Sequence, residues 1–171
     1  MVRLRQQNSS FLLLEASRIK RKIDGNSYLI NRNLRRCIMD KYLKETKMLN
    51  YSNANIQQLI RERRWKNINE FERLKSIYDF VRDEILFGYN IDDNVPASKV
   101  LADGYGQCNT KGTLFMAILR ACNIPCRVHG FTIDKKLQKG AMTGIVYKNA
   151  PQNVFHSWVE VYFEDRWYEL E

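Results

Sequence analysis

The chain has 171 residues, 44% of them hydrophobic, and a formal net charge of +9. This length is enough for one domain with a hydrophobic core and a short additional segment. No stretch approaches the roughly 18 consecutive apolar residues of a membrane span. The apolar run behind the basic start, residues 11–14, is also shorter than the core of a secretory signal, which has about 7–15 residues. We therefore expect a cytoplasmic protein with no membrane partner.

The positive charge is concentrated at the start of the chain. Residues 1–38 hold nine basic and two acidic side chains, whereas the rest of the chain holds 19 basic and 17 acidic ones. Polar tracts interrupt every helical pattern in residues 1–38, so we predict a basic extension there, free to be mobile, and a folded domain over residues 39–171. No nucleic-acid motif accompanies the charge. A tether to nucleic acid or to an acidic partner is therefore the less favoured alternative.

The four cysteines are predicted to be reduced thiols. Cys37, Cys108, Cys122 and Cys126 are irregularly spaced in a chain without an export signal, which argues against a disulfide framework. The two histidines of the chain are too few to complete a zinc site with the last two cysteines. We expect no metal and no cofactor.

Helical patterns dominate the first half of the predicted domain. A helix is predicted from about Asn55, and a second apolar stripe with intervals of three and four residues runs over residues 71–85. Asn69 and Glu72 give this second helix a start similar to a capping box. Its polar face, Arg73 included, is expected to be solvated. Residues 96–101 predict a short turn of helix.

A glycine-rich turn then leads into a helix at a cysteine. Gly104 and Gly106 precede Gln107 and Cys108, and the amphipathic pattern of a helix runs over residues 110–122. Free backbone N–H groups and the positive end of the helix dipole favour a thiolate at such a position. The pattern predicts a nucleophilic Cys108 whose pKa lies well below that of a free cysteine.

The last part of the chain changes to the alternating pattern of strands. Strands are predicted over residues 126–133, 145–147 and 154–163, with a polar loop over residues 135–140, and helices followed by an antiparallel meander indicate an α+β fold. On the last of these strands one set of side chains should face the core: Phe155, Ser157, Val159, Val161 and Phe163. The opposite set is His156, Trp158, Glu160 and Tyr162.

The end of the chain is expected to pair with that strand. A two-residue turn at Glu164-Asp165 would place Phe163 opposite Arg166. In this register Glu171 lies diagonal to His156 and within reach of the imidazole. We therefore predict that Glu171 orients His156, provided that the turn is as described.

Three segments carry a resemblance to a known family. They are Gly104-Tyr105-Gly106-Gln107-Cys108, residues 119–127, and His156-Ser157-Trp158-Val159-Glu160-Val161-Tyr162 followed by residues 167–171. Together they resemble a transglutaminase-like domain over residues 71–171, a superfamily whose core is similar to that of papain-type cysteine proteases. The resemblance implies a nucleophile at a helix N-terminus, packed on an antiparallel sheet. It also implies a Cys-His-Asp triad, which maps onto Cys108 and His156 with Glu171 in the place of Asp.

The predicted chemistry is acyl transfer through a thioester. Cys108 attacks the carbonyl of a peptide or protein amide, and His156 protonates the leaving amine. Gly106, Gln107, His129 and Trp158 are expected to bind substrate or line the site. Transfer to water makes a cysteine peptidase or amidase, which we favour. Transfer to a lysine makes a protein-glutamine gamma-glutamyltransferase, a cross-linking enzyme, and a non-catalytic binding module that retains the fold is the third alternative.

Overall fold

A computed structural model describes residues 39–170 except Ala141 and Thr143. The predicted basic extension and Glu171 therefore lie outside the described residues. The described residues fall into two compact units, one of residues 39–133 with 155–170 and one of residues 134–154. The domain boundary proposed at residue 38 stays a prediction.

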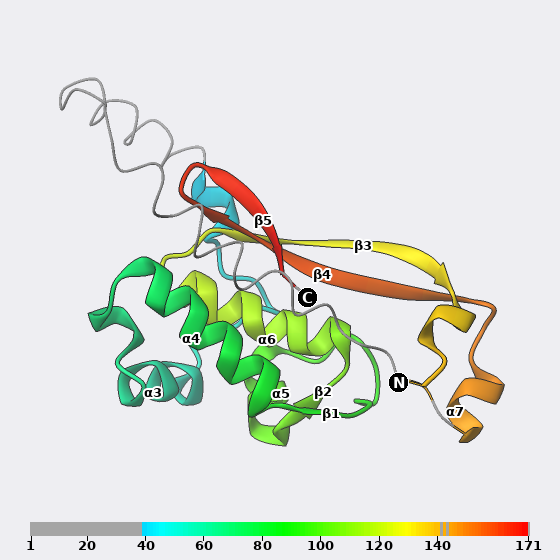
Figure 1. Cartoon of the computed structure of the whole chain (residues 1–171). Coiled ribbons are helices and arrows are strands. Elements are labelled where there is room, and N and C mark those ends of the chain that lie inside the picture. The colour runs from blue at the N-terminus through cyan, green and yellow to red at the C-terminus, as the bar shows by residue number, and fades with distance from the viewer. Residues whose placement is uncertain (1–38, 141, 143, 171) are drawn as a thin grey trace. The chain divides into compact units, whose positions relative to one another are not determined.

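Helices make up the first half of the larger unit (Figure 1). They are α3 (Ala54–Glu62), α4 (Glu70–Asp83), α5 (Ala97–Asp103) and α6 (Cys108–Ala121), with short 3-10 turns at Asp40–Tyr42 and Trp65–Asn67. The predicted cap of α4 is confirmed, because the Asn69 side chain accepts a hydrogen bond from the Glu72 N–H at 2.9 Å. This cap satisfies one of the backbone donors that a helix leaves free at its start.

Helix α6 is the centre of the core. It packs against α3, α4 and α5, and its side chains from Leu114 to Leu119 are all buried. The fully buried side chains around them include Ile56 and Ile60 of α3 and Ile77 of α4. A helix that is apolar on nearly all sides has to lie inside the domain. The start of α6 is therefore held by packing as well as by its cap.

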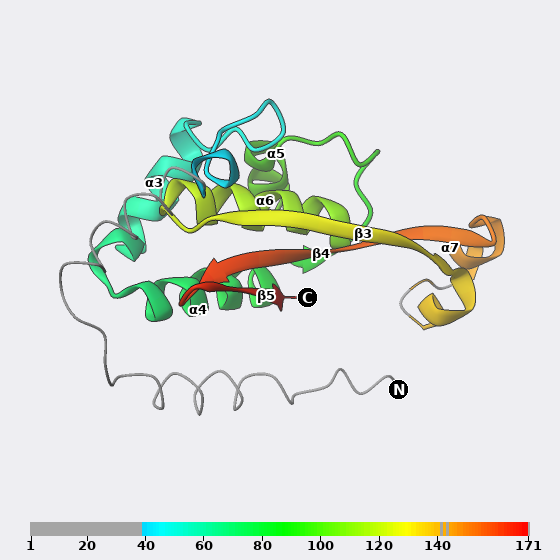
Figure 2. The same ribbon diagram turned by 90° about the horizontal axis from the view of Figure 1, so that it is seen from above.

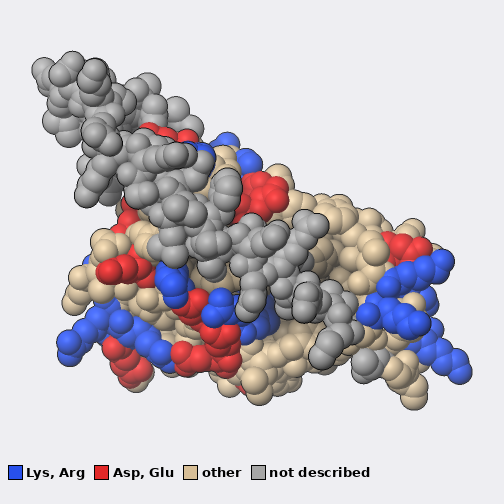
Figure 3. Space-filling view, viewed as in Figure 1, with Lys and Arg blue, Asp and Glu red and all other residues tan. Residues whose placement is uncertain are grey.

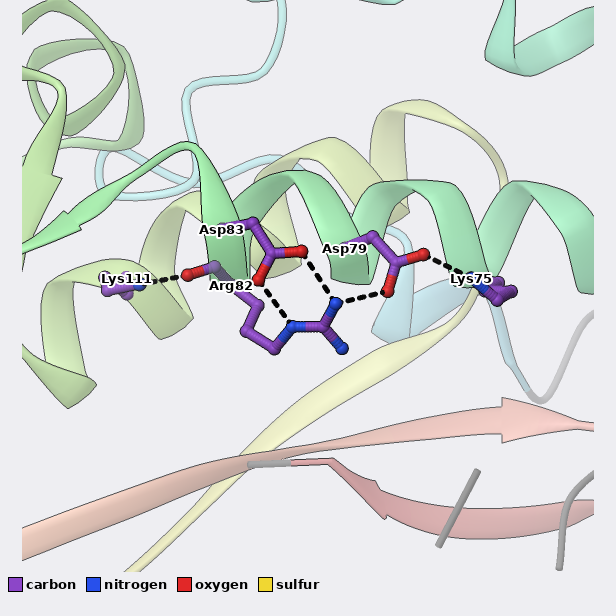
Figure 4. Close-up of polar contacts among 5 residues, drawn as sticks. All are labelled: Lys75, Asp79, Arg82, Asp83 and Lys111. Atoms are coloured by element: carbon purple, nitrogen blue, oxygen red, sulfur yellow. Dashed lines mark hydrogen bonds and ion pairs between the residues drawn. The ribbon is translucent and has the colours of Figure 1, made fainter. Parts of the chain in front are cut away.

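The face of α4 that is turned away from the core carries charged groups. Lys75 and Arg82 both form ion pairs with Asp79, and Arg82 also pairs with Asp83 (Figure 4). Figure 3 shows basic and acidic side chains intermixed over the described surface around α3 and α4. The predicted solvated face is confirmed for these residues.

Two short strands connect the segments before α5 and α6. Strand β1 (Leu86–Phe87) pairs in parallel with β2 (Tyr105–Gly106), so that Phe87 lies opposite Gly106. This pairing was not predicted, since two-residue strands carry no periodicity. It fixes the turn before Cys108 to the end of α4.

A three-stranded antiparallel sheet lies on one side of α6 (Figures 1 and 2). Its order is β3 (Cys126–Asp134), β4 (Asn153–Phe163) and β5 (Arg166–Leu170). The predicted two-residue turn is confirmed, because Phe163 pairs with Arg166 and both turn residues, Glu164 and Asp165, have positive φ angles of 46° and 66°. Such angles belong to the hairpin turns that match the twist of a sheet.

The predicted core face of β4 is confirmed in its C-terminal part. Val159, Val161 and Phe163 are buried. Phe155 was predicted to be in the core, but the prediction is wrong, because its side chain is 58% exposed. Its ring lies instead against Gly130 of β3, where an added Cβ would come within 2.3 Å of the ring. The ring thus takes the space that the missing side chain of Gly130 leaves.

The smaller unit corrects the prediction for residues 145–147. These residues lie in the helix α7 (Gly144–Asn149) instead of a strand, and the expected loop before them contains a 3-10 turn at Lys135–Gln138. The Lys135 ammonium group donates to the carbonyl oxygen of Ala150 at 2.8 Å, just beyond the end of the helix. A cation at that end satisfies carbonyl groups that a helix leaves free. Three apolar residues are too few to distinguish the period of a helix from the alternation of a strand.

Within residues 39–170, leaving out 141 and 143, no helix has the length and apolar character needed to cross a membrane.

Candidate active site

Cys108 is the first residue of α6, as the glycine-rich turn predicted. Gly104 ends α5 with a φ angle of 70°, a conformation that side chains other than glycine disfavour. Gly106 leaves room for the cap of α6, since a Cβ there would come within 2.6 Å of Thr110 Oγ1. That hydroxyl oxygen accepts a hydrogen bond from the Gln107 N–H at 3.0 Å. Both glycines are therefore needed to present the thiol at the helix start.

Backbone N–H groups gather around the sulfur of Cys108. The N–H groups of Ser157, Asn109 and Cys108 itself each act on the thiol and favour its thiolate form. The side-chain oxygen Oδ1 of Asn109 lies 3.6 Å from Sγ and accepts from the thiol. Ser157 belongs to β4, so the sulfur connects the helix start to that strand.

The thiol nevertheless holds its proton more tightly than a free cysteine. Burial raises the pKa of Cys108 above its ordinary value, and the negative charge of Asp93 raises it further. The backbone N–H groups lower the pKa but do not compensate for burial. The predicted lowering of the Cys108 pKa is therefore wrong, because the prediction considered the helix start and not the packing above it.

The side chains on both sides of Cys108 are held by one carboxylate. Asp93 accepts hydrogen bonds from Gln107 Nε2 at 2.8 Å and from Asn109 Nδ2 at 2.9 Å. Oδ1 of Asn109 also accepts from the Ser157 hydroxyl at 2.6 Å. Three residues of this site, Asp93, Asn109 and Ser157, were not predicted from the sequence. No local pattern marks them, because the contacts span 14, 16 and 48 positions of the chain.

Tyr89 is a further neighbour of the thiol that sequence analysis missed. Burial and the charge of the Cys108 thiolate raise the pKa of its hydroxyl. Its ring packs edge to face with that of Phe87, with 5.5 Å between the ring centroids. Both rings are partly exposed. The surface beside the thiol is therefore aromatic.

His156 directly precedes Ser157, the residue of β4 whose N–H acts on the Cys108 thiol. Alternation gives it the face opposite to that of the Ser157 side chain, together with Trp158. Its imidazole packs edge to face on Phe131 of β3, with 6.1 Å between the centroids, and its Nδ1 atom is shielded from solvent. The pairing of Cys108 with His156 remains a prediction, and Glu171 lies outside the described residues.

The predicted site-lining residues fall into two groups. Gly106 and Gln107 lie beside Cys108, whereas His129 and Trp158 pack on each other, 5.6 Å apart at the ring centroids. His129 Nδ1 also lies 3.4 Å from a carboxylate oxygen of Glu160. The second group therefore shares its face of the sheet with the imidazole of His156. Within the part of the chain that the structure describes, no three or more potential metal-ligating His, Cys, Asp or Glu side chains come together.

Comparison with known proteins agrees with this geometry. The family model for the transglutaminase-like superfamily matches residues 57–171, which is more than half of the chain and includes the start of α6 and all of β4. The chain belongs to the transglutaminase-like superfamily. The resemblance predicted from the three segments is thereby confirmed.

The chain is also similar to two individual proteins. Uncharacterized protein YebA of Bacillus subtilis (strain 168) is 28% identical over 113 residues, which cover 60% of this chain and 15% of that protein. A crystal structure of a protein from Cytophaga hutchinsonii, named "Putative Cysteine Protease", superposes with a TM-score of 0.59 at 18% identity. The match covers 78% of this chain and 41% of that one. The structural likeness confirms the predicted α+β, papain-like fold, and the chain spans less than half the length of either relative.

Proposed function

We propose that this transglutaminase-like domain is a cysteine peptidase or amidase that transfers the acyl group of a peptide or protein amide to water through a thioester on Cys108. The observation that carries the proposal is the position of the thiol. Cys108 begins α6, and three backbone N–H groups favour its thiolate form, one of them from the residue after His156. A nucleophile and its base commonly come from separate elements in this way.

The proposal requires that the imidazole of His156 reaches the sulfur of Cys108. A backbone N–H of a strand points within the plane of its sheet, so an atom that contacts the Ser157 N–H lies at the edge of β4, between its two faces. The side chain of the preceding residue can turn to that edge from its own face. We infer that His156 approaches Cys108 there, with its shielded Nδ1 as the basic atom.

The raised pKa of Cys108 determines how the reaction begins. The resting thiol is protonated, so His156 takes this proton while the sulfur attacks the carbonyl carbon. The carbon–sulfur bond forms, the carbon–nitrogen bond breaks, and the imidazolium returns the proton to the leaving amine. Water then hydrolyses the thioester and restores the thiol. The N–H of Cys108 is the proposed donor to the developing oxyanion, and loss of such a donor costs about 2.7–4 kcal/mol of transition-state stabilisation.

Thiol alkylation tests the coupling between the two residues. Iodoacetamide labelling of each cysteine is mapped by mass spectrometry in wild-type protein, His156→Ala and His129→Ala. The two variants remove the two histidines of the chain one at a time. We expect Cys108 to label at least about tenfold more slowly in His156→Ala near pH 7.5, and to keep its rate in His129→Ala, because only His156 serves as the base.

Cys122 provides an internal reference for this experiment. It is buried, and burial raises its pKa to about 11. Wild-type Cys108 should therefore label faster than Cys122. Equal labelling of Cys108 in wild-type protein and His156→Ala would exclude the proposed base and favour a non-catalytic binding module. The raised thiol pKa is the one observation that supports that second candidate.

The acceptor of the acyl group distinguishes hydrolysis from cross-linking. Reaction of a glutamine-containing protein such as casein is followed with and without an added primary amine. A hydrolase releases ammonia or cleaves peptide bonds in both cases. Incorporation of the amine in preference to hydrolysis would identify a cross-linking enzyme instead.

A further inference from the structure

Asp93 holds the two amide side chains that flank the nucleophile. It lies in the segment between β1 and α5, and its two carboxylate oxygens accept from Gln107 Nε2 at 2.8 Å and from Asn109 Nδ2 at 2.9 Å. Gln107 and Asn109 are the residues directly before and after Cys108. One side chain thus fixes both neighbours of the proposed nucleophile.

The charge of Asp93 determines which way both amides face. An ionised carboxylate only accepts hydrogen bonds, so each amide turns its NH₂ group toward Asp93 and its carbonyl oxygen away. The Gln107 oxygen accepts from the Asn90 N–H at 2.9 Å. The Asn109 oxygen faces the Ser157 hydroxyl at 2.6 Å and the Cys108 thiol at 3.6 Å. An acceptor beside the sulfur stabilises the thiol and opposes the thiolate.

We infer that Asp93 is a positioning residue, which fixes the amides on both sides of Cys108 and holds the Asn109 carbonyl oxygen as the acceptor of the thiol proton. The inference rests on the proposed function in one respect, namely that Cys108 is the nucleophile. Its consequence is a resting enzyme with a protonated and therefore weakly reactive thiol. The sulfur becomes nucleophilic when the imidazole removes the proton.

The other charged groups near the sulfur are consistent with this role. From the segment after β1, the Asp93 charge raises the Cys108 pKa, and Tyr89 is the other titratable neighbour. On β4, His156 directly precedes Ser157, whose N–H acts on the Cys108 thiol. On α6 itself, Lys111 donates from its ammonium group to the carbonyl oxygen of Arg82 at 3.2 Å (Figure 4). The same group donates to the carbonyl oxygen of Ile85 at 2.6 Å.

The test is the pH dependence of Cys108 alkylation by iodoacetamide in Asp93→Asn. This variant keeps the shape of the side chain, removes its charge and lets the two amides reverse. Asp92→Asn is the matched control, because it changes the charge of the adjacent residue, which accepts from the Asn94 N–H at 2.6 Å. We expect the midpoint of the Cys108 profile to fall by about one pH unit in Asp93→Asn, the size typical of one nearby charge, and by much less in Asp92→Asn.

A second variant keeps the test decisive if Asp93→Asn does not fold. Asn109→Ala removes the carbonyl oxygen that faces the thiol while Asp93 and Gln107 stay in place, and it should lower the midpoint in the same direction. Far-UV circular dichroism checks the fold of each variant. A midpoint that is unchanged in folded Asp93→Asn or folded Asn109→Ala, or one that moves equally in Asp92→Asn, would overturn the inference.

The readout also separates this inference from the proposed function. Alkylation reports the thiol without any turnover, whereas acetylation by p-nitrophenyl acetate reports acyl transfer. A lowered midpoint in a protein that forms no acetyl-enzyme would support the positioning role of Asp93 and reject the enzyme. A wild-type protein that forms acetyl-enzyme, with an unchanged midpoint in Asp93→Asn, would support the enzyme and reject the positioning role of Asp93.

Discussion

Arg73 of α4 should be among the side chains that contribute most to the stability of the domain. The sequence pattern placed it on the solvated face of its helix, but its guanidinium group makes its three shortest hydrogen bonds to backbone carbonyl groups, and a fourth, to Lys66, is 3.5 Å long. The three shortest are to Trp65 and Ile68, both at 2.8 Å, and to Cys122 at 3.0 Å. It thus joins the 3-10 turn before α4 to the end of α6.

The magnitude follows from the number and kind of these bonds. A hydrogen bond to a charged group contributes about 1.5–3 kcal/mol, and the half-buried position of Arg73 allows water to replace part of that. We expect Arg73→Ala to lower the free energy of unfolding by about 3–5 kcal/mol, a large part of the roughly 5–15 kcal/mol of a typical domain. Arg73→Lys retains the charge but not the planar fork, so about half of the loss should remain.

Urea unfolding followed by circular dichroism measures the difference. Lys75→Ala is the control, since Lys75 lies on the same helix and forms an exposed ion pair with Asp79 (Figure 4). Exposed pairs at this spacing contribute about 0.3–0.5 kcal/mol. If Arg73→Ala lies within about 1 kcal/mol of Lys75→Ala, the reasoning about the three carbonyl groups is wrong.

Four further variants are tested in the same unfolding assay. Glu160→Gln leaves Arg127, which is partly exposed, beside a neutral partner and should lower the free energy of unfolding by about 1–3 kcal/mol; a neutral effect would show that the ion pair contributes nothing. Gly106→Ala should cost about 1–3 kcal/mol and slow Cys108 labelling, because its Cβ would displace Thr110. Gly112→Ala, with only an ordinary contact to Val159 at 3.5 Å, should stabilise α6 by up to about 1 kcal/mol; equal effects of the two alanines would contradict the geometry. The pKa of Cys122, raised to about 11 by burial, contributes stability below about pH 8.5 that is lost as the pH rises toward 11. Cys122→Ala should therefore flatten the loss of stability over this range, and parallel curves would refute that assignment.

The elements that the sequence predicted correctly have local signals. The Asn69 cap of α4 and the Glu164-Asp165 turn of the hairpin both depend on residues within four positions of each other. Their partners are fixed by backbone geometry, so the pattern is sufficient. The position of Cys108 at the start of α6 followed in the same way from Gly104 and Gly106.

The features that were missed depend on contacts across the fold. Asp93 lies in an irregular segment. The pairing of β1 with β2 and a hydrogen bond from the Asn90 N–H to Gln107 hold that segment beside the start of α6. The pKa of Cys108 was predicted in the wrong direction because burial depends on what packs above the helix start. Phe155 follows the alternation along β4, but its ring packs on Gly130 of β3 and stays exposed, which alternation alone did not predict.

The most direct test of the account is the detection of an acyl-enzyme on Cys108. The protein is mixed with p-nitrophenyl acetate, quenched with acid within the first turnover and analysed by peptide mass spectrometry, with His156→Ala and His129→Ala in parallel. We predict a hydroxylamine-sensitive acetyl group on Cys108 in wild-type protein and His129→Ala, and its loss in His156→Ala. Acetylation confined to other residues, or equal acetylation of Cys108 in all three proteins, would contradict the proposed chemistry.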